Sequence, residues 1–269
     1  MGTSYAKRNY QLQKIWELIM ATTLYLTERE EDSFQRHCRL SKILTNDSMH
    51  VFDVGANIGQ SISRYRDSFP NCLITSFEPN PEIFSLLEKN WSDVSGITLN
   101  PIALANNIGH ASFYATRVSE VGSLLVPTER MIKLSSEHKY DYKTINVPTL
   151  TLDHYCQARN VNKIDILKLD VQGFELNVLQ GAEILLQEGK VTMIYSEVTF
   201  AETYMNQTGF TDLVSYLNKF NYEIWDIGSF LYTRCDRLWA ANLTFLHTSA
   251  ASLIETKQTQ NKEVLNDPI

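Results

Sequence analysis

Four acidic residues stand where a short apolar run gives way to polar residues. They are Asp53 in HVFDVGANIGQ, Glu78 in LITSFEPNP, Asp170 in ILKLDVQGFE and Glu197 in MIYSEVTF. An unpaired charge is costly to bury, so a carboxylate at the end of a buried strand requires a partner, a ligand or a cation. These four chain positions therefore predict a ligand site built largely from carboxylates.

The first two positions together predict an adenosine-type ligand. Gly55 and Gly59 permit a tight turn and close approach of the backbone, and the helix that follows presents free N–H groups. Glu78 closes the next predicted strand, about twenty positions after Gly55, where a carboxylate can accept both hydroxyls of a ribose.

The glycine spacing indicates which adenosine ligand to expect. A dinucleotide site needs G-x-G-x-x-G, whereas Asn57 and Gln60 occupy the second and third glycine positions here. Asp53 would repel a diphosphate, but it suits the sulfonium and amino groups of S-adenosylmethionine (SAM). We therefore expect SAM as the cofactor and not a nicotinamide dinucleotide.

Asp170 and Glu197 are the candidate catalytic residues. At equal height on neighbouring strands their backbones would lie about 5 Å apart. Two carboxylates at such a short distance either share a proton, or hold a divalent cation, or divide the roles of base and anchor. The sequence leaves these three alternatives open. For Glu175, a helix-start role and a catalytic role explain the residue equally well.

The elements that must position these residues alternate between strand and helix patterns. Apolar runs that read as strands occur at 50–54, 72–78, 96–104, 163–171, 191–198, 222–227 and 238–246. Strands apolar on both faces and separated by helices predict an α/β fold with a doubly wound, mostly parallel, Rossmann-like sheet. Ligands of such sheets bind beyond the carboxyl ends of the strands, where the four acids lie.

Three parts are expected along the chain. Residues 1–47 form an N-terminal helical appendage, with an apolar stripe over 12–20 and a second helix at 33–44. The appendage packs on the main domain, covers a pocket or forms a homodimer face. Residues 48–250 form the cofactor-binding domain, and residues 251–269 are a polar tail expected to fray.

Composition excludes several classes of protein. The chain has 269 residues, 24 Lys and Arg against 31 Asp and Glu, and a net charge of −7, which removes the attraction that nucleic-acid binding usually needs. No apolar run approaches the ~20 residues of a membrane span, and no secretory signal is apparent. The four cysteines form no CxxC pair and are expected to be free thiols in a cytoplasmic protein.

Several motifs follow one another in order and carry a family resemblance. They are DVGANIGQ, FEPNP, NPIALAN, KLDVQGFE and VLQGA. Between about residues 50 and 247 the chain resembles the FkbM family of SAM-dependent methyltransferases. The resemblance implies the class I methyltransferase fold, a seven-stranded sheet with its last strand antiparallel. It implies cofactor contacts at Asp53, Gly55, Ala56, Asn57, Gly59, Glu78, Pro79, Asn80, Ala103 and Leu104, with Asp170 facing the methyl-transfer site.

The same resemblance implies a function. Family members are similar to O-methyltransferases of secondary metabolism, so the expected reaction is methylation of a hydroxyl on a small polyketide, sugar or lipid-type metabolite. The N-terminal helices and residues 117–147 are expected to select the acceptor. The alternatives are an N-methyltransferase and a non-catalytic SAM-binding module, and a divalent cation remains an open possibility.

Overall fold

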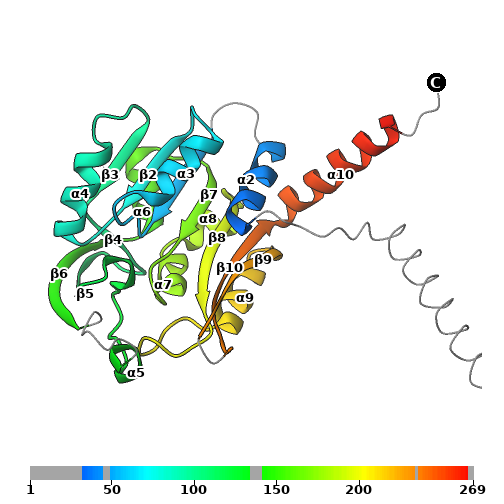
Figure 1. The fold of residues 1–269 in the computed structure, drawn as a ribbon. Helices are drawn as coiled ribbons and strands as arrows, with labels where there is room; N and C mark the ends of the chain where they lie inside the picture. Colours follow the sequence, from blue (N-terminus) through cyan, green and yellow to red (C-terminus); the bar gives the residue numbers. More distant parts are fainter. Residues whose placement is uncertain (1–31, 45–48, 134–140, 234–235, 266–269) are drawn as a thin grey trace, which may run out of the picture. The chain divides into compact units, whose positions relative to one another are not determined.

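A computed structural model describes residues 32–44, 49–133, 141–233 and 236–265 of the chain. The chain divides into two compact units, residues 1–31 and residues 32–269. The first unit lies outside the described residues, and with it the apolar stripe predicted over 12–20. The second unit contains all the elements in Figure 1 that carry labels.

The second unit is built on one large sheet of seven strands. Their order is β3-β2-β1-β7-β8-β10-β9, and every neighbouring pair is parallel except those made by β10. The strands are β1 (His50–Val54), β2 (Leu73–Phe77), β3 (Ile97–Asn100), β7 (Ile164–Leu169), β8 (Val191–Thr199), β9 (Tyr222–Tyr232) and β10 (Leu238–His247). The predicted mostly parallel, doubly wound α/β sheet with an antiparallel last strand is confirmed.

Helices cover both faces of this sheet, and each face has its own apolar core. One face carries α2 (Ser33–Leu44), α3 (Gln60–Ser68) and α4 (Pro81–Trp91), and the other carries α6 (Leu152–Arg159), α7 (Glu175–Gln180), α8 (Glu183–Gln187) and α9 (Phe210–Asn218). Because side chains alternate along a strand, Val51 packs in the first core and Phe52 in the second. Asp53 therefore points to the side of α2 and α3.

A smaller sheet lies on the same side of the domain as β3 and α4 (Figure 1). It consists of β4 (Ala103–Leu104), β5 (Gly109–Thr116) and β6 (Tyr142–Leu150), in the order β4-β6-β5. The sequence predicted a single strand over 96–104, and this prediction was wrong. Pro101 lacks the N–H that a strand interior needs, so β3 ends at Asn100 and β4 joins the second sheet.

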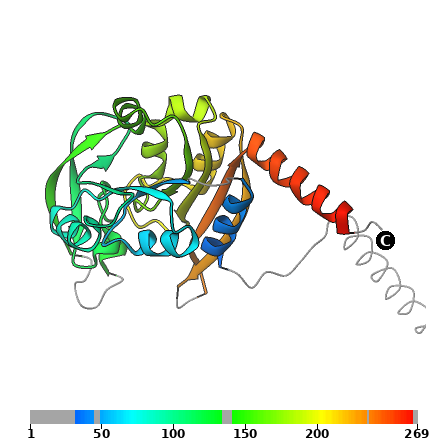
Figure 2. The same cartoon turned by 90° about the horizontal axis from the view of Figure 1, so that it is seen from above.

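Helix α2 and the start of the last helix meet beside β9 and β10. Helix α2 spans the residues predicted for it, and Figure 2 shows it next to the start of α10 (Thr248–Leu265). The sequence predicted a tail that frays from residue 251. The structure differs at the start of that tail, because Ala251 and Ile254 are buried in the core under α2. None of the helices in the described part of the chain is long and apolar enough to cross a membrane.

Candidate active site

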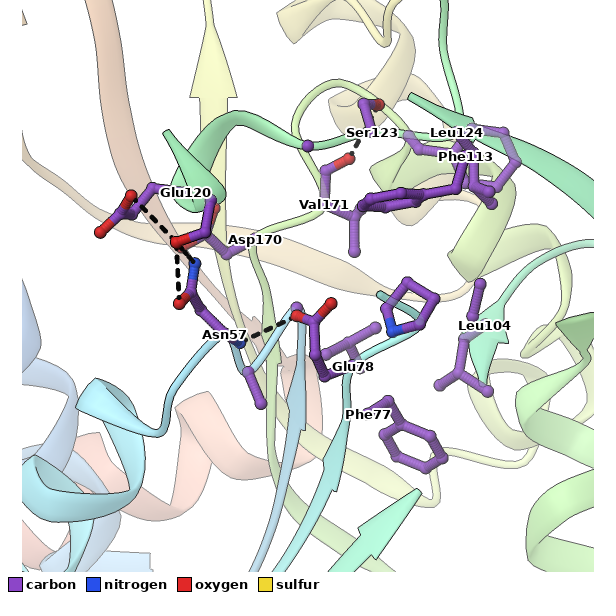
Figure 3. A pocket seen from close by; sticks show the side chains of 18 of the residues that line it. Asn57, Phe77, Glu78, Leu104, Phe113, Glu120, Ser123, Leu124, Asp170 and Val171 are labelled. Carbon is purple, nitrogen blue, oxygen red and sulfur yellow. Dashed lines mark hydrogen bonds between the residues drawn. The ribbon is translucent and has the colours of Figure 1, made fainter. Parts of the chain in front are cut away.

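A cavity of about 240 Å³ opens beyond the carboxyl ends of β1, β2 and β7. It lies where the strand order reverses between β1 and β7, the position that ligands occupy in sheets of this kind. Figure 3 shows Glu78 between two differing sides: Asn57, Glu120 and Asp170 on one, Phe113 and Leu124 on the other. The cavity thus has a polar end and an apolar end.

The loop between β1 and α3 forms the floor of the polar end. Gly55 adopts a positive φ of 81°, and a Cβ there would stand 1.9 Å from the carbonyl oxygen of Asp170. The amides of Gly55 and Ala56 both donate to the carbonyl of Phe77, at 3.1 and 3.0 Å. Asn57 donates its backbone N–H to Glu78 Oε2 at 3.0 Å. These bonds tie the loop to the end of β2.

Glu78 is the central carboxylate of the cavity. Only 6% of its surface is exposed, and its Oε1 accepts the backbone N–H of Asn80 at 2.8 Å. With the bond from Asn57, each oxygen receives one N–H and keeps a lone pair for a further donor. Burial raises the Glu78 pKa to about 7, although both backbone hydrogen bonds oppose that rise. A pair of hydroxyls is well suited to such a carboxylate.

Lys168 connects this floor to the acids around it. Its Nζ lies 3.0 Å from Asp53 Oδ1 and 3.5 Å from Asp170 Oδ2, and it donates to the Gly55 carbonyl at 3.2 Å. Burial alone would lower the Lys168 pKa, but the charges of Asp53 and Asp170 outweigh burial and raise it. Lys168 was not assigned a role from the sequence, although it lies in the KLDVQGFE motif.

Asp53 occupies a different place from the one expected. Its side chain has no exposed surface and does not line the cavity. Lys168 lies between it and the cavity and neutralises its charge. In this geometry the Asp53 side chain does not reach the cavity, so its expected direct contact with a cofactor is not supported by the lining residues. Asp53 supports the site through Lys168.

The two candidate catalytic acids lie side by side, as expected. Leu169 is paired with Ser196 in the β7–β8 register, so Asp170 and Glu197 follow at equal height. Gln172 Nε2 donates to Asp170 Oδ1 at 2.9 Å and to Glu197 Oε2 at 2.8 Å. Asp170 lines the cavity, with 41% of its side chain exposed, whereas Glu197 does not line it. Burial, followed by the charge of Asp170, raises the Glu197 pKa to about 8.

Glu175 has a structural role in this geometry. It is buried at the start of α7, and its Oε1 accepts the backbone N–H groups of Val171 and Gly173 at 3.3 and 3.1 Å. Burial raises its pKa to about 7. Glu175 does not line the cavity, so it holds the loop that carries Asp170 in place.

Most of the residues predicted to touch a cofactor line the cavity. Those that do are Gly55, Ala56, Asn57, Glu78, Pro79, Ala103, Leu104 and Asp170. Gly59 and Asn80 do not: Gly59 packs against Trp91, and Asn80 accepts the Glu82 N–H as the N-cap of α4. The rest of the wall was not assigned residue by residue from the sequence, although part of it falls within residues 117–147, which were expected to select the acceptor. It consists of Ile102, Phe113, Ser119, Glu120, Ser123, Leu124, Val171 and Phe174.

No metal centre is evident in the part of the chain that the structure describes. No group of three or more His, Cys, Asp or Glu side chains there could hold a metal ion. Asp170 and Glu197 together provide two carboxylates, and both share the amide of Gln172. The described residues therefore give no support to the divalent-cation alternative.

The fold and the site define the chain as a class I methyltransferase by its strand order and by its cavity beyond β1 and β7. Residues 53–224 match the family described as the methyltransferase FkbM domain, and the chain belongs to that family. The resemblance seen in the sequence is thereby confirmed.

The chain is also similar to individual proteins, at low sequence identity. The chain is 24% identical over 194 residues to the 2-O-methyltransferase NoeI of Sinorhizobium fredii, a match that covers 70% of this chain and 79% of that protein. It is 30% identical over 139 residues to the hexuronic acid methyltransferase AglP of Haloferax volcanii, covering 51% of each. Among solved structures it is similar to magnesium protoporphyrin IX methyltransferase (ChlM) from Synechocystis PCC 6803 with bound SAM, at 11% identity and a TM-score of 0.44, over 87% of this chain and 96% of that one.

Proposed function

We propose that the protein transfers the methyl group of SAM to a hydroxyl of a small metabolite of polyketide, sugar or lipid type. The observation that carries this proposal is the placement of Glu78 and Asp170 in one cavity, which the glycine loop between β1 and α3 also lines. Family membership supports methyl transfer. The names of NoeI and AglP support an oxygen acceptor on a sugar-like compound.

The cavity residues fit an adenosyl group. Glu78 is buried, faces the cavity and has one free lone pair on each oxygen, which matches the two hydroxyls of a ribose. Ile102, Ala103, Leu104 and Phe113 form an apolar wall of the kind that an adenine ring packs against. The polar end of the cavity, with Asp170, would then hold the methionyl group.

Bound SAM supplies a sulfonium-linked methyl group. The protein must hold an acceptor hydroxyl in line with that methyl carbon, because positioning accounts for much of the rate of such a displacement. Asp170 accepts the hydroxyl proton as the new carbon–oxygen bond forms and the carbon–sulfur bond breaks. The products are the methyl ether, S-adenosylhomocysteine (SAH) and a protonated Asp170, which balances the atoms and the charge.

Two alternatives use the same cavity. An amine acceptor would make the protein an N-methyltransferase, and a chain that binds SAM without an acceptor would be a binding module. The exposure of Asp170 to the cavity favours chemistry over binding alone, because a binding module has no use for a base at that end. Release of SAH from a mixture with a hydroxylated or an amine acceptor distinguishes the three cases.

The first experiment measures cofactor binding. The melting temperature of the purified chain should rise with SAM or SAH concentration and should not respond to NAD. Glu78→Gln should weaken SAH binding, because the amide keeps the shape of the side chain but retains only one acceptor oxygen for the N–H groups of Asn57 and Asn80. Circular dichroism of the variant checks that the fold is retained. A chain that ignores SAH, or that binds NAD equally well, would contradict the proposal.

A further inference from the structure

Gln172 has a backbone conformation that few residues of its type adopt. Its φ is +55°, in the left-handed region that favours glycine or asparagine. The loop around it is tied down on both sides: Ser123 Oγ donates to the Gln172 carbonyl at 2.9 Å, and the Thr208 N–H donates to the Gly173 carbonyl at 2.7 Å. A strained residue that is held this firmly at a site is an indication of a functional constraint.

The side chain of Gln172 uses its whole amide on the two carboxylates. An amide nitrogen carries two hydrogens, and here one points to Asp170 and the other to Glu197, at 2.9 and 2.8 Å. The hydroxyl of Tyr204 donates to the Val121 carbonyl at 2.7 Å and lies 3.4 Å from the amide oxygen. Because ionised carboxylates only accept hydrogen bonds, it is the NH₂ end of the amide that faces the two acids. Gln172 itself does not line the cavity.

The two acids that share this amide have different surroundings. Asp170 faces the cavity, and its second oxygen is close to the Lys168 ammonium. Glu197 lies behind it, and the charged groups that act on it are Asp170, Glu175 and the more distant Lys168. Without a donor between them, two neighbouring carboxylates share one proton, and either acid can then serve as the base.

We propose that Gln172 is a positioning residue that divides the roles of the two acids. By giving one N–H to each carboxylate, it holds Asp170 toward the cavity as the proton acceptor and keeps Glu197 out of the reaction. This inference rests on the proposed methyl transfer for its meaning, because only then is a single base required. The inference is based on the hydrogen-bond geometry of the amide. It assigns a role to a residue that does not line the cavity.

The test follows the titration of Glu197 in the full chain without any acceptor. Protein labelled with ¹³C at the glutamate carboxyl is titrated by NMR, and Glu197→Gln identifies the resonance by its loss. Gln172→Met keeps the length and unbranched shape of the side chain but removes both donors. Gln172→Gly removes them as well and suits the left-handed backbone, so at least this variant should fold.

In the natural chain the Glu197 resonance should titrate near pH 8. In both variants it should move up by about one pH unit, because a hydrogen bond to the charged carboxylate is lost. A Glu197 midpoint that stays in place in both variants would overturn the proposal, and so would a natural chain in which Glu197 titrates like an exposed glutamate. A role in loop stability alone would lower the melting temperature without moving this midpoint.

SAH affinity, measured on the same samples, keeps the two hypotheses apart. It should be unchanged in Gln172→Met, since Gln172 does not line the cavity. If the natural chain fails to bind SAH, the proposed function fails, while the Glu197 titration still decides whether Gln172 controls the two acids.

Discussion

We predict that the affinity of the chain for an adenosyl ligand depends on pH through Glu78. A ribose diol donates to a carboxylate, so binding requires the ionised form, and burial has raised the Glu78 pKa to about 7. Above pH 7 the group is mostly ready to bind. At pH 5.5 only about 3% of the chains carry an ionised Glu78, so the apparent Kd should be about thirtyfold higher than at pH 8. The affinity for the ligand should therefore rise as the pH rises.

Calorimetry with SAH between pH 5.5 and 8 measures this dependence. Adenosine is the control ligand, because it carries the ribose but lacks the α-amino and carboxyl groups of SAH, which could titrate by themselves. Glu78→Gln should bind more weakly and show a flat profile, since the amide does not ionise in this range. A flat profile in the natural chain, or the same slope in Glu78→Gln, would refute the assignment of Glu78 to the ribose.

Four further predictions concern the rest of the site. Gly55→Ala should lose at least about 2 kcal/mol of stability in thermal unfolding, because its Cβ would meet the Asp170 carbonyl at 1.9 Å; an equally stable variant would show that the loop is looser than described. Asp170→Asn should lower turnover about a hundredfold or more while SAH affinity changes little, and surviving turnover would remove Asp170 as the base. Glu197, with its pKa raised to about 8, stabilises the fold fully below pH 4.5 and loses that contribution as pH rises through 8. In denaturant unfolding, the stability of Glu197→Gln relative to that of the natural chain should therefore rise between pH 5 and pH 8, by on the order of a few kcal/mol. If the curves of stability against pH stay parallel for the two proteins, this prediction is contradicted. EDTA should leave methyl transfer unchanged, and activity restored by an added divalent ion would show a metal site.

The order and type of the main elements could be predicted because local signals agreed with the fold. Pro81 and Asn80 start α4, and Thr151 caps α6 by accepting the His154 N–H. The nearly continuous apolar run of β7 is buried along its whole length, as a central strand should be. The equal height of Asp170 and Glu197 followed from these strands alone, because adjacent parallel strands end at one edge.

The apolar wall of the cavity could not be predicted from local patterns. Phe113 and Leu124 come from β5 and the segment after η1 (Ser119–Val121), far from the strand ends that carry the motifs. An exposed-looking aromatic in a short strand is as consistent with packing as with a ligand site. Similarly, an aromatic residue near a strand end can line a pocket, but Tyr195 of β8 is buried against α2, where its hydroxyl lies 2.8 Å from Ser33 Oγ. Only the tertiary arrangement separates these cases.

The selection against a diphosphate has a different physical basis from the one the sequence suggested. The sequence argument relied on repulsion by Asp53, but Lys168 neutralises that charge below the cavity. The loop itself provides the selection. From Gly55 to Gly59 every backbone N–H already has an acceptor within the fold: the Phe77 carbonyl, Glu78, the Asn57 side chain or the Ala56 carbonyl. A diphosphate depends on free amides at this turn, and here they are committed to hold Glu78 and the end of β2. The same bonds that hold Glu78 in place therefore leave no free amide between Gly55 and Gly59 for a dinucleotide.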